Sequence, residues 1–155
     1  MTSLDITQNS LLEDLRINNN LLSNLDITLK PQLITLECND NLLPNLDLSQ
    51  NTALEILRCN NNLLTSLNIK NGNNYNIFIF EALNNANLFC INVDDADYST
   101  SNWTNIDPQT SFSENCALSI DDFDSKNLVY IYPNPTSNYI NIISQLPILK
   151  VEVSN

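Results

Sequence analysis

The sequence predicts a mainly β fold: a short solenoid of 21-residue coils with a parallel sheet and little helix, then a C-terminal cap and a partial β-sandwich tail. Three observations lead to this fold class. Leucines recur every 21 residues, each coil holds apolar pairs spaced two residues apart, and 29 of 155 residues are asparagine against one glycine. A fixed period of this length indicates a solenoid, because stacked repeats bury one another's apolar side chains.

The repeat is visible when the chain is written in rows of 21 residues beginning at Leu4, Leu25, Leu46 and Leu67. The third row reads LDLSQNTALEILRCNNNLLTS. Residues at equal positions in the rows are expected to form three columns: Leu12, Leu33, Leu54 and Tyr75; Leu15, Leu36, Leu57 and Phe78; Ile17, Cys38, Cys59 and Phe80. The fourth row has Leu83 where the pattern calls for asparagine, so Asn84 or Asn85 is expected to take that position after a shift.

Two phrases in each row predict extended segments. The phrase L-x-x-L-x-[IC]-x-x-N-x-L is that of leucine-rich repeats. Its last apolar pair, such as Leu57 and Cys59, has the period of a strand, so both side chains face the same side and successive strands pair in parallel. The phrase L-[DN]-[IL] predicts a second short extended segment on the opposite, convex side, which leaves the first sheet concave.

Asparagine is the expected turn residue of the coils. It tolerates left-handed and turn conformations, and so replaces the glycine that the chain lacks. Asn20, Asn41 and Asn62 stand where the chain leaves the first strand. We expect their amides to bond backbone groups that would otherwise be buried without partners.

Residues 88–116 are predicted to close the solenoid as a cap, with Tyr98, Trp103 and Phe112 supplying apolar surface. Cys90 and Cys116 bracket this segment, and the hypothesis is a disulfide between them; two buried thiols are the alternative. The other two cysteines lie in one inward column and are expected to be free thiols, although a bridge between adjacent coils fits their spacing. A disulfide would indicate an oxidising compartment.

The repeats and the cap resemble a known group of proteins. The phrases L-D-[IL]-[ST]-x-N and L-x-C-x-x-N, with the cap run from LFCINVDD to FSENC, are similar to short leucine-rich-repeat proteins secreted by Gram-negative bacteria. The resemblance covers residues 4–116 and implies a secreted or surface-displayed interaction module.

The tail carries a second resemblance. Residues 117–127 are acidic and polar, which predicts a linker. In residues 128–155 two apolar stretches flank the turn cluster PNPTSN, and the phrase Y-P-N-P-[TS]-x-x-x-I-x-I is similar to the start of the C-terminal sorting domain of the type IX secretion system. This family is a small β-sandwich, and the resemblance implies export across the outer membrane. The predicted organisation is therefore coils at 1–87, cap at 88–116, linker at 117–127 and a truncated sorting domain at 128–155.

Composition excludes several functions. The chain has 18 acidic and 6 basic residues, for a net charge of −12, which argues against nucleic acid as a partner. It has no histidine, so catalytic arrangements that use one are excluded. No stretch is long enough to span a membrane, and no cofactor or metal is expected. Asp94, Asp95 and Asp97 form an acidic group, for which capping of backbone N–H groups is favoured over calcium.

The candidate ligand-binding residues are those expected to project from the concave sheet. Arg16, Glu37 and Arg58 occupy one position in successive coils, either as an ion-paired ladder or as part of a ligand surface. Isoleucine is less expected than charge on an exposed sheet, so Ile56, Ile77 and Ile79 are the best candidates for an apolar patch. Asn18, Asn39 and Asn60 are expected beside them.

Taken together, these features predict a non-enzymatic module, secreted or displayed at the cell surface, that binds a protein or a glycan across the concave sheet. Two other functions fit the sequence: a structural spacer, and an accessory region of a longer secreted enzyme. The chain begins without a recognisable signal peptide, so the expected location and the type IX secretion partner follow from the resemblance alone.

Overall fold

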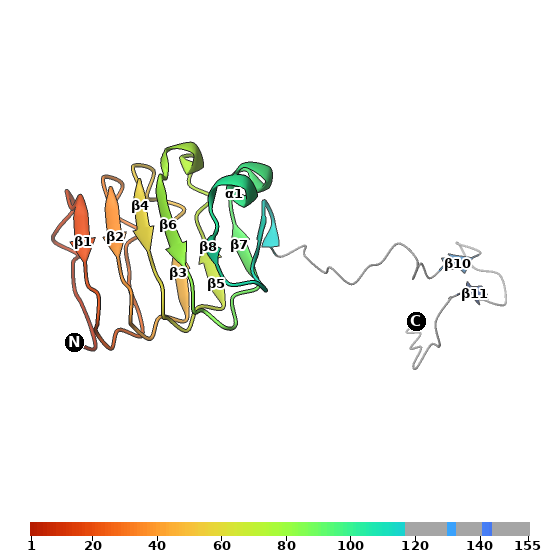
Figure 1. The fold of residues 1–155 in the computed structure, drawn as a ribbon, viewed down its shortest axis with the longest axis horizontal. Helices are drawn as coiled ribbons and strands as arrows, with labels where there is room; N and C mark the ends of the chain where they lie inside the picture. The colour runs from red at the N-terminus through yellow and green to blue at the C-terminus, as the bar shows by residue number, and fades with distance from the viewer. Residues whose placement is uncertain (117–129, 133–140, 144–155) are drawn as a thin grey trace. The chain divides into compact units, whose positions relative to one another are not determined.

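A computed structural model describes residues 1–116, 130–132 and 141–143. The chain divides into two compact units, Met1–Ser119 and Ile120–Asn155. The first unit is a mainly β solenoid with two parallel sheets and a single α-helix, which confirms the predicted fold class. Its coils follow one another side by side along the solenoid axis (Figure 1).

The larger sheet is built from the leucine-rich phrase of each coil. Its strands pair in parallel in the order β1-β2-β4-β6-β8, so each coil adds one strand beside the last. The strands are β1 (Asp14–Arg16), β2 (Thr35–Glu37), β4 (Ile56–Arg58), β6 (Ile79–Ala82) and β8 (Asn105–Ile106).

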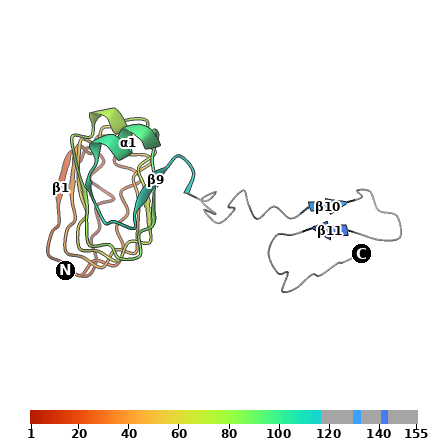
Figure 2. The same cartoon turned by 45° about the vertical axis from the view of Figure 1, so that its right-hand side comes forward.

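The second sheet lies on the other side of the coils, where the second phrase places it. Its four parallel strands run in the order β3-β5-β7-β9, and Figure 2 shows the coils as nested loops with the two sheets on opposite walls. The strands are β3 (Asn45–Asp47), β5 (Ser66–Asn68), β7 (Cys90–Asn92) and β9 (Ser111–Ser113). Both sheets continue beyond residue 88, so the residues of the predicted cap add strands to the coil.

Apolar columns fill the space between the sheets. Leu36, Leu57 and Leu54 are fully buried, and the same positions of the neighbouring coils contribute to one continuous core. Each fully buried leucine is worth about 1.5–3 kcal/mol relative to exposure, and no coil could bury its set alone. Stacking of coils is therefore the source of stability.

The fourth coil is shifted, and three expected column positions were wrong. Leu57 pairs with Phe80, 23 residues later, because the segment between Ile69 and Ile77 is two residues longer than in the earlier coils. The short 3-10 helix η1 (Asn74–Asn76) takes up this extra length. As a result Ile77 is buried in the Leu54 column at 1% exposure, whereas Tyr75 and Phe78 are exposed at 64% and 67%.

Buried asparagine side chains bridge successive coils. The Nδ2 group of Asn41 lies 3.0 Å from the carbonyl oxygen of Ile17 in the previous coil and 3.2 Å from that of Cys38 in its own. Its Oδ1 accepts a hydrogen bond from the backbone N–H of Leu22, also in the previous coil. Asn62 repeats these contacts one coil later, and Asn85 repeats them in the shifted fourth coil.

The corner after the larger sheet has a left-handed backbone. The residues there with positive φ are Asn19 (58°), Asp40 (56°), Asn61 (55°) and Asn84 (60°). Asparagine and aspartate enter this conformation at lower cost than other non-glycine residues. The asparagines thus turn the corners, as expected from a chain with one glycine.

Aromatic side chains and a disulfide close the C-terminal end of the solenoid. Helix α1 (Ala96–Asn102) is followed by Trp103, whose ring stacks on Phe80 with centroids 4.5 Å apart and packs against Phe112 at 5.7 Å. The predicted disulfide between Cys90 and Cys116 is present, with Cα atoms 5.8 Å apart. Its 26-residue separation corresponds to about 3.5 kcal/mol in the chain-entropy model.

Of the second unit, the structure describes two strands. They are β10 (Tyr130–Tyr132) and β11 (Asn141–Ile143), which pair antiparallel with Tyr132 opposite Asn141. They flank the turn cluster PNPTSN, as predicted. The predicted linker and the remainder of the predicted sorting domain lie outside the described residues.

Replacement of Asn62 by alanine is expected to lower the free energy of unfolding by about 3 kcal/mol. The change leaves the Leu43 N–H buried without a partner and removes one of the two amide donors to the Cys38 carbonyl, so that only Asn41 remains there. Urea unfolding measures the loss, with Asn24→Ala as a control because Asn24 is exposed and should cost less than about 0.5 kcal/mol. Equal losses in the two variants would contradict a bridging role for the buried amide.

Candidate functional site

The candidate site is the outer side of the larger sheet, here called the five-stranded face. Strand pairing sets its outward side chains in columns that run across the coils. The apolar column contains Ile56 and Ile79, the charged column contains Arg16, Glu37, Arg58 and Glu81, and the asparagine column contains Asn18, Asn39 and Asn60.

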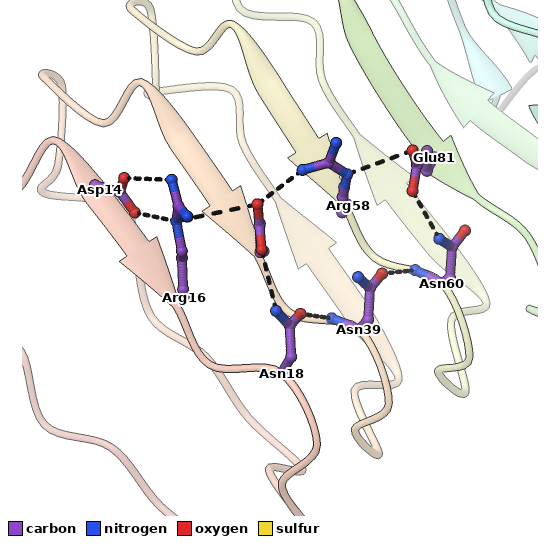
Figure 3. Close-up of polar contacts among 8 residues, drawn as sticks. Asp14, Arg16, Asn18, Asn39, Arg58, Asn60 and Glu81 are labelled. Atoms are coloured by element: carbon purple, nitrogen blue, oxygen red, sulfur yellow. Dashed lines mark hydrogen bonds and ion pairs between the residues drawn. The ribbon is translucent and has the colours of Figure 1, made fainter.

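The charged column is a continuous ion-paired ladder (Figure 3). The Glu37 carboxylate accepts a hydrogen bond from Arg58 Nη1 at 2.7 Å and lies 4.0 Å from Arg16 Nε. Arg58 Nε is 3.3 Å from Glu81 on the other side. Arg16, at the first strand, pairs mainly with Asp14 of its own strand at 2.9 Å. The two arginines are thus matched by three carboxylates, and the column carries little net charge.

The asparagine column fixes the register of the coils. Asn18 Oδ1 accepts from the backbone N–H of Asn39 at 2.9 Å, and Asn39 Oδ1 accepts from that of Asn60 at 2.8 Å. The Nδ2 groups of Asn18 and Asn60 donate to Glu37 and Glu81, each at 3.1 Å. These bonds join the two polar columns into one network and hold the carboxylates in place (Figure 3).

Two of the three isoleucines proposed for the apolar patch lie on this face. Ile56 and Ile79 occupy paired positions in β4 and β6 and are partly exposed. The assignment of Ile77 was wrong, because the register shift turns its side chain into the core. Phe78, beside Ile79, is instead exposed.

Sequence reasoning missed Glu81 as the fourth member of the charged column. Strict 21-residue spacing places Ile79 after Arg58, whereas the observed pairing of β4 with β6 places Glu81 there. The position of Asn85 in the sequence could have revealed the place of Glu81. Once Asn85 is aligned with Asn62, the fourth coil shifts by two residues and Glu81 falls opposite Arg58.

Two members of the acidic group near the cap, Asp94 and Asp95, accept hydrogen bonds from backbone N–H groups. Asp94 Oδ2 accepts from the Gly72 N–H at 2.9 Å. Asp95 caps helix α1 by accepting from the Tyr98 N–H, also at 2.9 Å, and it receives the Tyr75 hydroxyl. The Tyr75 hydrogen bond is the main reason that the pKa of Asp95 is lowered. Among the residues with a described position, no group of three or more histidine, cysteine or acidic side chains could hold a metal ion.

The thiols of Cys38 and Cys59 are free and fully buried. Burial raises the pKa of Cys38 to about 12, and it also raises the pKa of Cys59. Both thiols therefore remain protonated at neutral pH, which removes the nucleophilic thiolate form. They act as small apolar members of the core.

Comparisons with known proteins find similarity to a solved structure. No family model matches the chain, and no curated protein matches it either. Among solved structures, the functional domain of InlJ from Listeria monocytogenes, described as including a cysteine ladder, is 27% identical with a TM-score of 0.49. The match covers 58% of this chain and 22% of the InlJ chain. Within the described part of the chain, no helix has the length and apolar character needed to cross a membrane.

A double-mutant cycle on Glu37→Ala and Arg58→Ala is expected to give a coupling energy of about 1 kcal/mol in urea unfolding. Both side chains are partly buried, with exposed fractions of 15% and 30%, so solvent screens the pair only in part. The same cycle on Asp14 and Arg16, which are 51% and 61% exposed, is the control and should give a smaller coupling energy, because solvent screens this pair more. A larger coupling for the control pair would contradict the ladder as described.

Proposed function

We propose that the chain is an exported protein-binding or adhesion module that recognises its partner across the five-stranded face and carries out no catalysis. The observation that carries this proposal is the face itself: a regular surface on which partly exposed Ile56 and Ile79 lie beside an ion-paired charged column. Apolar side chains in a rigid polar surround have the composition of a protein-recognition surface.

The face is preorganised, which favours binding. Hydrogen bonds from Asn18 and Asn60 and ion pairs from Arg58 hold its carboxylates before any partner arrives. A partner therefore does not bear the entropic cost of ordering these side chains. The net charge of −12 favours partners with basic patches, and salt should weaken their binding.

The absence of catalysis is supported by composition and by how the acids are used. The chain contains no histidine. On the five-stranded face, Glu37 and Glu81 are each tied to an arginine and an asparagine. Both carboxylates therefore have a structural role in the network of the face, which supports a binding surface over a catalytic one.

Export is supported by two features. The disulfide between Cys90 and Cys116 is of the kind that persists in oxidising compartments. The tail motif resembles a type IX sorting domain, so we infer that the protein passes through that secretion system and reaches the cell surface or the medium.

Ile56→Ser and Ile79→Ser, each in the full chain, are expected to weaken capture of the protein partner at least about tenfold, or about 1.4 kcal/mol each. Binding of immobilised variants to extracellular protein fractions, followed by titration with the captured partner, measures the effect. Leu29→Ser is the control, because Leu29 is 76% exposed and lies outside the face. Unchanged binding by both isoleucine variants would refute recognition through this face.

Deletion of the segment that begins at residue 128, in a host with a type IX secretion system, is expected to retain the protein inside the cell envelope. Immunodetection in the medium, the outer membrane and the periplasm measures the distribution. A matched deletion of residues 117–127 controls for chain shortening and should leave export intact. Export that persists without the tail would contradict the sorting function.

A further inference from the structure

A groove opens at the C-terminal end of the five-stranded face, between strand β6 and the connection from α1 to β8. Phe80 and Trp103 form its floor, and both are 4% exposed and stacked on each other. The side chains that line it and could meet a ligand are Arg58, Phe78, Glu81, Asn102 and Asn105. The stacked floor makes the base of the groove rigid.

Phe78 supplies an aromatic surface that the core does not require. It is 67% exposed, in a position where the preceding coil has Glu55. Phe78 is followed by the partly exposed Ile79, which also lines the groove, so the two form an apolar pair beside polar groups. Its ring offers a flat apolar surface for stacking at the edge of the groove.

One polar side chain of the groove, Glu81, is held by neighbouring side chains, and another, Asn105, has its hydrogen-bonding groups open to a ligand. Glu81 lies next to Asn105 across the pairing of β6 with β8, and its carboxylate is held by Arg58 at 3.3 Å and Asn60 at 3.1 Å. The Asn105 side chain has no hydrogen bond among the described residues. A carboxylate provides acceptors, and a free amide provides both donors and an acceptor.

Charge limits the ligand class. Arg58 is the cation of the groove lining, and it is paired with Glu37 on one side and Glu81 on the other. The two carboxylates compensate its positive charge, which disfavours a phosphate or a carboxylate as the ligand. The acidic charge of the whole chain disfavours anions further.

The strand arrangement also disfavours an extended peptide. Peptides commonly bind by adding a strand to an open sheet edge. Strand β6 pairs with β4 from Ile79 to Glu81 and with β8 at Glu81 and Ala82, so only Ile79 and Phe80 lie beyond the β8 pairing, which is too short an edge for an added strand.

We propose that this groove binds a neutral saccharide, with one sugar ring stacked on Phe78 and its hydroxyl groups bonded to Asn105 and Glu81. A sugar ring presents C–H groups on its face and hydroxyl donors and acceptors around its rim, which matches an aromatic ring next to an amide and a carboxylate. The inference rests on the proposed function in one respect, since the groove is the end of the same face.

The test is titration of the isotope-labelled full chain with the methyl glycosides of neutral hexoses and N-acetylhexosamines, followed by NMR. The indole N–H of Trp103 is a unique signal at the floor of the groove, because the chain has one tryptophan. At least one neutral glycoside should shift the Trp103 and Asn105 signals saturably. A methyl glucuronide, which is anionic, should bind at least about tenfold more weakly.

Phe78→Ala should weaken the glycoside affinity at least about tenfold. Phe89→Ala is the matched control, because Phe89 is 61% exposed and lies outside the groove, and its affinity should stay within about twofold. Thermal unfolding of both variants verifies that they are folded. Asn105→Ala is a second variant, on the polar side of the groove, and should also lose affinity.

The proposal is overturned if no neutral glycoside shifts the groove signals, if the glucuronide binds best, if Phe78→Ala and Phe89→Ala lose affinity equally, or if Asn105→Ala keeps the wild-type affinity. Ile56 separates failure of the saccharide proposal from failure of the proposed function. This residue lies on the five-stranded face but outside the groove lining. Partner capture that depends on Ile56 without glycoside binding would remove the saccharide inference alone. Glycoside binding with partner capture independent of Ile56 and Ile79 would remove only recognition of a protein.

Discussion

The structure depends on hydrogen bonding between neighbouring coils at buried positions. A solenoid that buries its leucines also buries backbone groups at each corner, and those groups need partners. Asn41, Asn62 and Asn85 supply them, since each side chain reaches carbonyl groups in its own and the preceding coil and accepts one N–H from the preceding coil. The leucine core and the asparagine bridges therefore support each other. Apolar packing brings the coils together, and the amides fix which position of one coil meets which position of the next.

The properties of the five-stranded face follow from that register. Because each coil adds one strand in parallel, side chains at equal positions form columns with strand spacing between members. Opposite charges alternate along one column, so neighbours attract across every interface from Arg16 to Glu81. The adjacent asparagine column ties the carboxylates to the backbone corners. A surface that is rigid in this way suits recognition, and the two partly exposed isoleucines give it an apolar centre.

The sequence was sufficient to predict the structure of the regular repeats. It was insufficient in the coil where the repeat length changes. The inward leucines, the paired sheets and the disulfide were all predicted, because period, strand alternation and cysteine placement are local or regular signals. Ile77, Tyr75 and Phe78 were misplaced, since two extra residues before the fourth strand are absorbed in a 3-10 turn that periodicity does not reveal. The groove at the end of the face was not predicted for the same reason. Its lining includes Phe78 and Asn105, and their places in the fold follow only from the shifted register and from the strand after helix α1.

The most direct test of the account is amide hydrogen exchange at Leu22, Leu43 and Leu64. In the structure these N–H groups donate to the side-chain oxygens of Asn41, Asn62 and Asn85 in the next coil, at 3.0, 3.1 and 3.2 Å. The account predicts that they exchange as slowly as the amides of the central strands β2 and β4. Exchange at the rate of an unstructured peptide, with those strands protected, would show that the asparagine bridges do not hold the coils together.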